Sequence, residues 1–432
     1  MIHIDKSSIL RGVQMRKPFF IIIVIFMFSL IACSSKQTNA KKETWIIEEQ
    51  EGSKDLKEAK EIEEPVIENK EPKVYSARMR VVGDIMVHKW QLWEAYDSSS
   101  NTYNFDRQFE LIKSELVAAD ITIGNLETTF GGKERGYSDY PRFNTPDALA
   151  TTLKDAGFDL LTTANNHTMD TNAPGAIRTL EVLDQLGLEH AGTYRSQEES
   201  EKMQLKVVNG ISFVFLSYTY GTNGIPVPKD LPYLVNLIET EKMKADIKKA
   251  EELSPDFIVV NLHFGEEYQK YPNETQKELV DELFDAGADI ILGGHPHVIQ
   301  PMEVRKIIRS DGTEERGFVI YSLGNFISCQ RTPLDPPRDA GIILNLDFEK
   351  IDDQKAMLKG ISFMPTWVQF TKRNGKRVIR VIGNNLSDED LKTYLTEEEI
   401  NRFRSTKQNT LKQLLGDQEV KEENGFYIYD IE

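Results

Sequence analysis

The sequence predicts an α/β domain in which helices flank a mixed sheet or two packed sheets. Short apolar runs, typical of buried strands, alternate with stretches whose apolar residues recur at helical spacing. Two turn signals, Asn209-Gly210 and Asp311-Gly312, separate β-rich runs with no helix between them. Helices between buried strands indicate layers around a sheet, and hairpins add antiparallel strands to it.

The expected elements begin at Ala77 and follow one another along the chain. Strands are expected at 78–82, 121–123, 160–163, 257–262, 289–292, 341–348 and 360–370, with hairpins at 204–220 and 302–323. Helices are expected where apolar residues face one side, at 109–116, 148–156, 175–186 and 275–286, with a charged helix ending at 247–253 and a helical tail at 388–416.

The chain begins with a targeting signal. Four basic residues precede the apolar stretch 18–31, which suits a signal peptide and is short for a membrane span of about 20 residues. Leu30-Ile31-Ala32-Cys33 closes this stretch and resembles the bacterial lipobox, whose cysteine is acylated. Cysteine occurs only twice in the chain, so its place here favours a lipoprotein over an ordinary secretory signal or an uncleaved anchor. We expect residues 1–32 to be removed and Cys33 to anchor the protein to the cell membrane, facing the extracytoplasmic side.

Three further segments follow the signal. Residues 33–74 are rich in Lys and Glu and cannot bury enough apolar surface to order themselves, so we expect a charged flexible tether. Residues 75–335 carry the alternating pattern and the polar motifs of the main domain. Residues 336–432 are expected to form C-terminal strands and a helical extension that packs on this domain.

The acidic composition limits the class of partner. The 52 Lys and Arg against 69 Asp and Glu give a formal net charge of -17, whereas nucleic-acid binding needs clustered basic residues. Nucleic acid is therefore excluded as a partner. An anionic ligand would be repelled unless a metal ion or a local basic patch met it.

Polar residues gather where five predicted strands end, the edge at which open α/β folds place their sites. Four of the seven histidines in the chain fall in these groups. Histidine, aspartate, asparagine and glutamate suit Zn, Mn or Fe, and a carboxylate such as Asp84 or Glu127 can bridge two ions. The groups are Gly83-Asp84, Gly124-Asn125-Leu126-Glu127, Ala164-Asn165-Asn166-His167, His263-Phe264-Gly265-Glu266-Glu267-Tyr268 and Gly293-Gly294-His295-Pro296-His297.

Together with Tyr321-Ser322-Leu323-Gly324-Asn325-Phe326, these groups resemble the CapA family of capsule biosynthesis proteins, also called the poly-γ-glutamate synthesis (PgsA) family. The resemblance covers residues 77–330. It implies the fold of the calcineurin-like metallophosphoesterases, a four-layer α/β arrangement of two packed mixed β-sheets flanked by helices.

The resemblance also implies roles for the matching residues. His167 corresponds to the histidine that protonates a leaving group. Glu127, or else Asn125, occupies the place of a bridging carboxylate. The implied metal ligands are Asp84, Glu127, Asn166, His263, His295 and His297. The residues that we expect to bind substrate are Asn125, Glu267, Tyr268 and Asn325. Glu266, Glu267 and Tyr268 line substrate or else support the metal ligands from outside.

The sequence departs from the phosphoesterase pattern in its first two motifs. Met86 stands where that pattern has a histidine ligand, with His88 two residues further on. The second motif carries Asn125 where the pattern has an aspartate. The number of divalent ions, two, one or none, therefore stays open, and so does catalytic turnover.

These features favour an accessory protein of capsule or envelope polymer biosynthesis or export. Its metal-dependent, hydrolase-like cleft would act on an anionic polymer resembling poly-γ-glutamate, or on its precursor, with His167 as general acid. The alternative is a non-catalytic subunit that binds polymer or organises a membrane synthase complex, which Met86 favours. A secreted phosphodiesterase is a third hypothesis, which the changes in the first two motifs disfavour.

Overall fold

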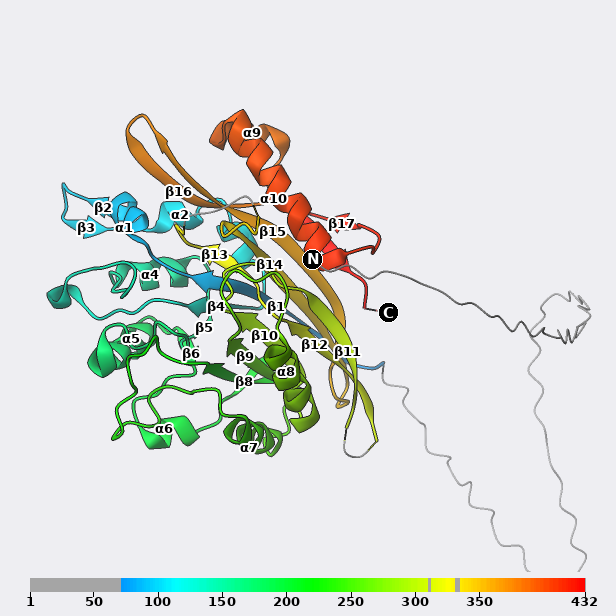
Figure 1. Ribbon diagram of the computed structural model, residues 1–432. Coiled ribbons are helices and arrows are strands. Elements are labelled where there is room, and N and C mark those ends of the chain that lie inside the picture. Colours follow the sequence, from blue (N-terminus) through cyan, green and yellow to red (C-terminus); the bar gives the residue numbers. More distant parts are fainter. Residues whose placement is uncertain (1–70, 310–311, 331–334, 432) are drawn as a thin grey trace, which may run out of the picture. The chain divides into compact units, whose positions relative to one another are not determined.

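Two β-sheets pack face to face and form the frame of the folded domain (Figure 1). The computed structural model describes residues 71–309, 312–330 and 335–431. The predicted signal peptide, Cys33 and the tether up to residue 70 lie outside the described residues. None of the helices in the described ranges has the length and apolar character that crossing a membrane requires.

The larger sheet is mixed and is built around β1. Met79 in β1 lies opposite Ile121 of the parallel strand β4 and opposite Leu346 of the antiparallel strand β14. The spatial order is β17 (Glu422–Glu423), β18 (Phe426–Tyr429), β15 (Met357–Arg373), β14 (Ala340–Ile351), β1 (Val74–Ile85), β4 (Ile121–Leu126), β5 (Leu160–Thr162) and β6 (Glu189–Ala191), with β16 (Lys376–Gly383) paired to β15 and β13 (Asn325–Ile327) to β1. The segment after residue 335 thus supplies strands to the same sheet as β1.

The smaller sheet is also mixed. Its strands β8, β9 and β10 run parallel to one another, so their carboxyl ends meet at one edge. The spatial order is β11 (Met302–Ile308), β12 (Glu314–Ile320), β10 (Ile290–Gly294), β9 (Phe257–His263), β8 (Ile211–Thr219) and β7 (Leu205–Val208). A separate short ribbon pairs β2 (Tyr96–Asp97) with β3 (Thr102–Tyr103).

Helices cover the outer faces of both sheets (Figure 1). Helix α8 has the local signals that define its ends, since the Asn273 side chain accepts a hydrogen bond from Gln276 N and Gly287 ends the helix with a φ of 119°. The helices are α1 (Lys89–Ala95), α2 (Asp106–Phe109), α3 (Lys113–Val117), α4 (Ala148–Asp155), α5 (Asn172–Gln185), α6 (Gln197–Glu201), α7 (Thr240–Glu251), α8 (Glu274–Ala286), α9 (Asp388–Tyr394) and α10 (Glu397–Leu415), with a 3-10 turn at Lys133–Arg135.

Apolar side chains fill the layers between these elements. Between the sheets, Phe213 of β8 and Phe257 of β9 pack on Phe348 of β14, with ring centroids 5.1 and 4.6 Å apart. Outside them, α1 to α5 pack on the larger sheet and α7 and α8 on the smaller one. The predicted four-layer α/β arrangement is confirmed.

Some local expectations differ from the structure. The helical spacing at 109–116 forms two short helices, since α2 ends at Phe109 and α3 begins at Lys113. The hairpin at Asn209-Gly210 is confirmed, and both residues have positive φ. Strand β16 was not predicted, although it follows Asn374-Gly375, a turn signal of the same kind.

Phe348→Ala should lower the free energy of unfolding by about 3–5 kcal/mol, because it leaves a cavity between two sheets that cannot close around it. Urea denaturation of the full chain, followed by circular dichroism, measures this loss. Phe370→Ala is the matched control, since Phe370 is 42% exposed and its truncation should cost roughly 1 kcal/mol. If both variants lost the same free energy of unfolding, the apolar layer between the sheets would not be a main source of stability.

Candidate metal centre

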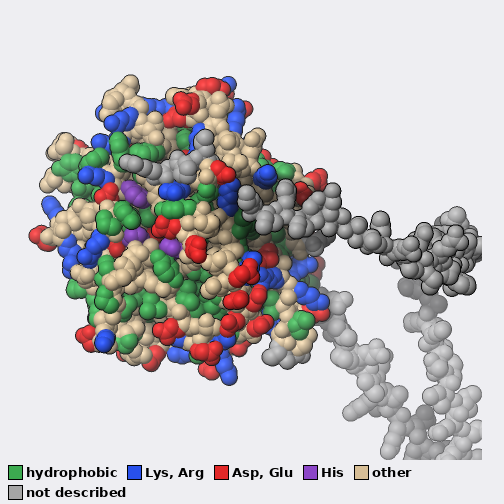
Figure 2. Space-filling model, in the orientation of Figure 1, with side chains coloured by type: hydrophobic (Ala, Val, Ile, Leu, Met, Phe, Trp, Pro, Cys, Tyr) green, Lys and Arg blue, Asp and Glu red, His purple; other side chains and the backbone are tan. Residues whose placement is uncertain are grey.

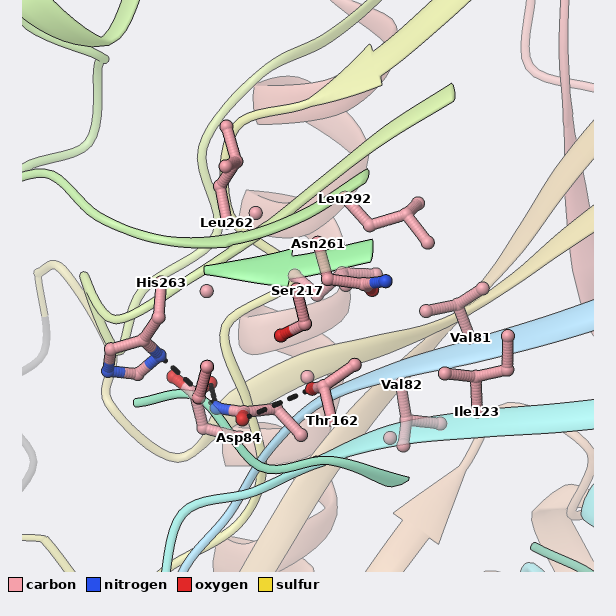
Figure 3. A pocket seen from close by; sticks show the side chains of 17 residues that line it. Val81, Val82, Asp84, Ile123, Thr162, Ser217, Asn261, Leu262, His263 and Leu292 are labelled. Atoms are coloured by element: carbon pink, nitrogen blue, oxygen red, sulfur yellow. Dashed lines mark hydrogen bonds between the residues drawn. The ribbon is translucent and has the colours of Figure 1, made fainter. Parts of the chain in front are cut away.

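The polar residues that follow β1, β4, β9 and β10 meet at one edge of the packed sheets. Asp84 and Glu127 come from the larger sheet, whereas His263, His295 and His297 come from the smaller one. All five side chains are buried. Figure 3 shows Asp84 and His263 close together although they belong to different sheets. Figure 2 shows histidine side chains grouped in one region of the surface.

The loop after β10 carries its two histidines in an unusual backbone conformation. His295 and His297 have φ of 97° and 57°, on either side of Pro296. Residues other than glycine rarely adopt such angles, and this strain concentrates at functional sites. Gly294 is required by close packing, because a Cβ there would lie 2.7 Å from Asp84 Oδ1. The smaller sheet can therefore approach Asp84 only with glycine at this position.

Glu127 belongs to both groups of side chains that could hold a metal ion. One group is Glu127, His295 and His297, and the other is Asp84, Glu127 and His263. The ligand atoms of each group lie within 4.8 Å of one another. Glu127 Oε1 is 3.6 Å from His263 Nε2 and 3.7 Å from His297 Nε2. This arrangement is the one expected of a bridging carboxylate.

Two asparagines lie against His263. Asn125 Nδ2 donates a hydrogen bond to Asp84 Oδ1 at 2.8 Å and lies 3.2 Å from His263 Nδ1. Asn166 Oδ1 lies 2.9 Å from His263 Nε2, beside the nitrogen that faces Glu127. Asn166 thus lies beside the candidate ligand His263, and Asn125 contacts both Asp84 and His263. The metal-binding role of Asn166 stays a prediction.

The His297 ring is oriented by contacts to its Nδ1 atom. Its Nδ1 lies 3.1 Å from Asn325 Oδ1 and 3.2 Å from Asp84 Oδ2. With Nδ1 engaged in this way, Nε2 is the nitrogen that faces Glu127. Such outer contacts fix the tautomer and direction of a metal-binding imidazole. Asn325 is fully buried and contacts His297, while the substrate contact expected of it stays a prediction.

Burial and mutual attraction set the charge states of the cluster. Burial, together with the charge of Asp84, raises the pKa of Glu127 well above its ordinary value. Burial also acts to raise the pKa of Asp84, but hydrogen bonding and attraction to His297 lower it to about 2. Burial, assisted by His297, lowers the pKa of His295 to about 3. Burial, assisted by His295, lowers that of His263 well below its ordinary value. Both imidazoles are then neutral near pH 7, the form that binds metal.

The residues of this cluster fit a divalent cation. Both carboxylate oxygens of Glu127 and Nδ1 of His295 are buried without a hydrogen-bond partner in the described part of the chain. Leaving such groups unpaired is costly, and a cation between them would satisfy both. Carboxylate and neutral imidazole suit Zn, Mn or Fe. The ligand set supports the predicted divalent ion, while its identity and number stay predictions.

His167 is close enough to the cluster for its charge to contribute to the lowered pKa values of His263 and His295, after the larger effect of burial. Its Nδ1 lies 2.7 Å from Asp170 Oδ2, and both side chains are buried. Asp170 Oδ2 also accepts a hydrogen bond from Phe143 N at 2.6 Å. Asp170 was not predicted as a site residue, although it follows His167 by three residues within one loop.

Neither residue near the missing histidine joins the candidate ligands. Met86 is buried, and its sulfur lies 3.9 Å from Gln330 Nε2. His88 Nδ1 accepts a hydrogen bond from Cys329 N at 3.2 Å. Both residues are outside the metal-binding groups found among the described residues, so His88 does not replace the ligand that is lost at position 86.

Two tyrosine rings pack against the histidines of the cluster. Tyr268 lies near His297, with ring centroids 6.2 Å apart, and burial and the exposed Glu267 carboxylate raise the pKa of Tyr268 to about 12. Tyr220, which was not predicted as a site residue, packs on His295 at 4.6 Å between centroids. Its position directly after β8, at the end of a strand, could have identified it as a site residue.

A small cavity lies between the sheets, next to Asp84 and His263 (Figure 3). Its volume is about 20 Å³, enough for about one water molecule. The cavity is therefore too small to hold a substrate, which must approach the cluster from another side.

The fold and the cluster together define a two-sheet α/β protein with a candidate metal centre of carboxylates and imidazoles. Residues 78–330 match the family described as bacterial capsule synthesis protein PGA_cap. This span is more than half of the chain and contains all the predicted metal ligands, so the chain belongs to this family.

Two curated relatives are similar to this chain over the same region. The chain is 30% identical over 260 residues to the capsule biosynthesis protein CapA of Bacillus anthracis, covering 58% of this chain and 60% of that protein. It is 30% identical over 262 residues to the PGA biosynthesis protein CapA of Bacillus subtilis (strain 168), covering 58% and 62%. The chain thus matches less than two thirds of the length of each relative.

Solved structures resemble the chain more distantly. The NAD nucleotidase of Haemophilus influenzae has a TM-score of 0.42 and 12% identity, covering 80% of this chain and 58% of that one. The calcineurin-like phosphoesterase YfkN of Bacillus subtilis has a TM-score of 0.36 and 14% identity, covering 79% and 99%. Similarity at this level assigns no activity to the chain.

Addition of Mn²⁺ or Zn²⁺ to the metal-free protein should raise its Tm. An ion that binds only the folded state stabilises it by about 2.7 kcal/mol at a concentration 100-fold above its Kd. Glu127→Gln and His295→Ala should remove most of this shift, because each removes a candidate ligand. Differential scanning calorimetry measures the shift, and elemental analysis measures the bound metal.

The control for this experiment is His190→Gln, since His190 lies 3.2 Å from Asp184 and belongs to neither candidate group. This variant should keep the full metal-induced shift, whatever its own Tm. A Glu127→Gln variant that still bound metal with unchanged stoichiometry and affinity would rule out the bridging position of Glu127.

Proposed function

We propose that this protein acts in the biosynthesis or export of an anionic capsule or envelope polymer resembling poly-γ-glutamate, with a metal-dependent hydrolase-like cleft. The polymer or its precursor is the substrate, and a lipid on Cys33 anchors the protein on the extracytoplasmic side of the cell membrane, where membrane synthase subunits are its partners. Membership of the capsule synthesis family supports the process, and the buried cluster around Glu127 supports the chemistry.

The observation that carries the catalytic proposal is the oriented His167–Asp170 pair beside the candidate metal ligands. The Asp170 carboxylate engages Nδ1 of His167, which leaves Nε2 to donate a proton to the leaving group of the substrate. Phe143 packs edge-on against the His167 ring at 4.6 Å between centroids and limits access of water to it. A divalent ion, when bound, would supply the positive charge that stabilises an anionic transition state.

A specific feature favours a second candidate, a polymer-binding subunit without turnover. The buried Met86 and the amide of Asn125 occupy positions where the phosphoesterase pattern has ligands, and Asn125 donates a hydrogen bond to Asp84. A centre with fewer ligands can hold an anionic polymer through its ion without cleaving it. The same two residues, Met86 and Asn125, also argue against a secreted phosphodiesterase.

His167→Gln should lower turnover by about 100- to 10,000-fold with little effect on metal content, because the glutamine cannot donate the proton. The assay uses the full chain loaded with Mn²⁺ or Zn²⁺, with phosphodiesters and γ-linked polyglutamate as substrates. Asp170→Asn should lower turnover less, and His190→Gln should leave it unchanged. Absence of turnover on both substrate classes, combined with metal-dependent polymer binding, would favour the non-catalytic subunit.

Cys33→Ser should release the protein from the membrane fraction, because serine cannot carry the thioether-linked lipid of a lipoprotein. Cys329→Ser is the matched control, since Cys329 is buried in the folded domain and should not affect anchoring. Incorporation of labelled fatty acid measures the modification, and cell fractionation measures the location. Labelled lipid that persists in Cys33→Ser would refute this anchor.

A further inference from the structure

Arg338 lies on the ring of Tyr268, beside the candidate metal centre. Its Cζ is 3.4 Å from the centroid of the Tyr268 ring, and that ring lies 6.2 Å from the ring of His297. Tyr268 has a φ of 65°, and its backbone N donates to Pro296 O at 2.8 Å. The loop that presents the Tyr268 ring is thus tied to the loop that carries His295 and His297.

The backbone around Arg338 is held from two directions. On the side of the candidate centre, Arg338 O accepts a hydrogen bond at 2.8 Å from Asn325 Nδ2, whose own carbonyl contacts His297. On the opposite side, Asp339 pairs with Arg402 of α10 at 2.9 Å and accepts from Trp367 Nε1 at 2.9 Å. These contacts therefore fix the position of Arg338 relative to His297.

The charge of Arg338 is not neutralised within the described residues. Its guanidinium makes no ion pair there, and its Nε is buried without a hydrogen-bond partner. Arg305 and Arg380 also lie over aromatic rings, but each has a carboxylate partner, Glu303 and Glu110 respectively. Arg377 lies over Trp90 and Trp93 and also has a buried Nε without a hydrogen-bond partner in the described residues. Arg338 differs from Arg377 because the ring beneath it lies against His297, a candidate metal ligand. In a chain of net charge -17, a partly buried arginine without a carboxylate partner can bind an external anion.

We infer that Arg338, stacked on Tyr268, is a substrate-anchoring residue that binds an oxyanion of the substrate, carboxylate or phosphate, next to the candidate metal centre. Stacking on the ring fixes the plane of the guanidinium, and its N–H groups are left to bind two oxygens side by side. Arg338 lies beyond residues 78–330, the span that matches the family. The inference rests on the proposed function, because it assigns the contact by which this acidic protein holds an anionic substrate.

Binding of the two oxyanion sources to the full chain tests this assignment. The probes are γ-linked glutamate oligomers and inorganic phosphate, titrated by calorimetry in the presence of Mn²⁺. Arg338→Gln should weaken binding of the recognised probe about 10- to 100-fold, because it removes charge-assisted hydrogen bonds. Arg338→Lys should bind with intermediate affinity, since it keeps the charge and loses the planar fork. Added salt should weaken binding more in the unmodified protein than in Arg338→Gln.

Matched variants separate recognition from folding. Arg316→Gln, at an exposed position of β12, should bind both probes normally. Tyr268→Leu should weaken binding, because it removes the ring on which Arg338 stacks. Arg338→Gln should also keep the unmodified Tm and the full Mn²⁺-induced shift. A lowered Tm or a lost Mn²⁺ shift in Arg338→Gln would mark a structural role and overturn the inference.

The outcomes distinguish this inference from the proposed function. If the unmodified protein binds a probe, His295→Ala loses binding and Arg338→Gln binds normally, the inference fails and the proposed function stands. If the unmodified protein binds neither probe, both fail. Selective loss of the glutamate oligomer or of phosphate in Arg338→Gln supports the inference and identifies which oxyanion the arginine recognises.

Discussion

The buried carboxylate of Glu127 is the constraint around which the site is organised. Neither of its oxygens receives a hydrogen bond in the described part of the chain, and Asp84 adds a second buried carboxylate nearby. Such a pair is stable only if a proton or a cation compensates it. The neutral rings of His263 and His295 offer lone pairs and cannot neutralise it themselves. The larger sheet supplies the two carboxylates, and the smaller sheet supplies the imidazoles that could hold a cation beside them. The packing of the two sheets and the chemistry of the site are therefore coupled.

Asn125 and Glu127 show how the loop after β4 brings a carboxylate to the centre although an amide stands at position 125. Side chains two positions apart on a strand point to the same face and are about 6–7 Å apart along it. Asn125 ends near Asp84 and His263 as a hydrogen-bonding amide, and Glu127 brings the carboxylate between the histidines of both groups. In this chain Glu127 supplies the carboxylate, and the amide of Asn125 donates a hydrogen bond to Asp84.

Much of this arrangement could be predicted from the sequence, because the residues concerned end buried strands. Asp84, His263 and His295 each follow an apolar run, and parallel strands bring such ends together. The pairing of His167 with Asp170 and the stacking of Arg338 on Tyr268 depend on loop conformation, which no periodicity encodes. Helix α1 and strands β6 and β13 were missed for a related reason. They are short and become stable only against the completed sheet.

The pairing of β1 with β14 has a consequence for the order in which the protein forms. From Val74 opposite Ile351 to Val82 opposite Ile343, the strand that carries Asp84 takes one whole side of its hydrogen bonds from a segment much later in the chain. Contacts of such long sequence separation form late, since a large loop must close first. A nascent chain that ended with the family-matched span would expose β1 as an unpaired edge. The strand that carries Asp84 can thus complete its hydrogen bonding only after β14 has been made.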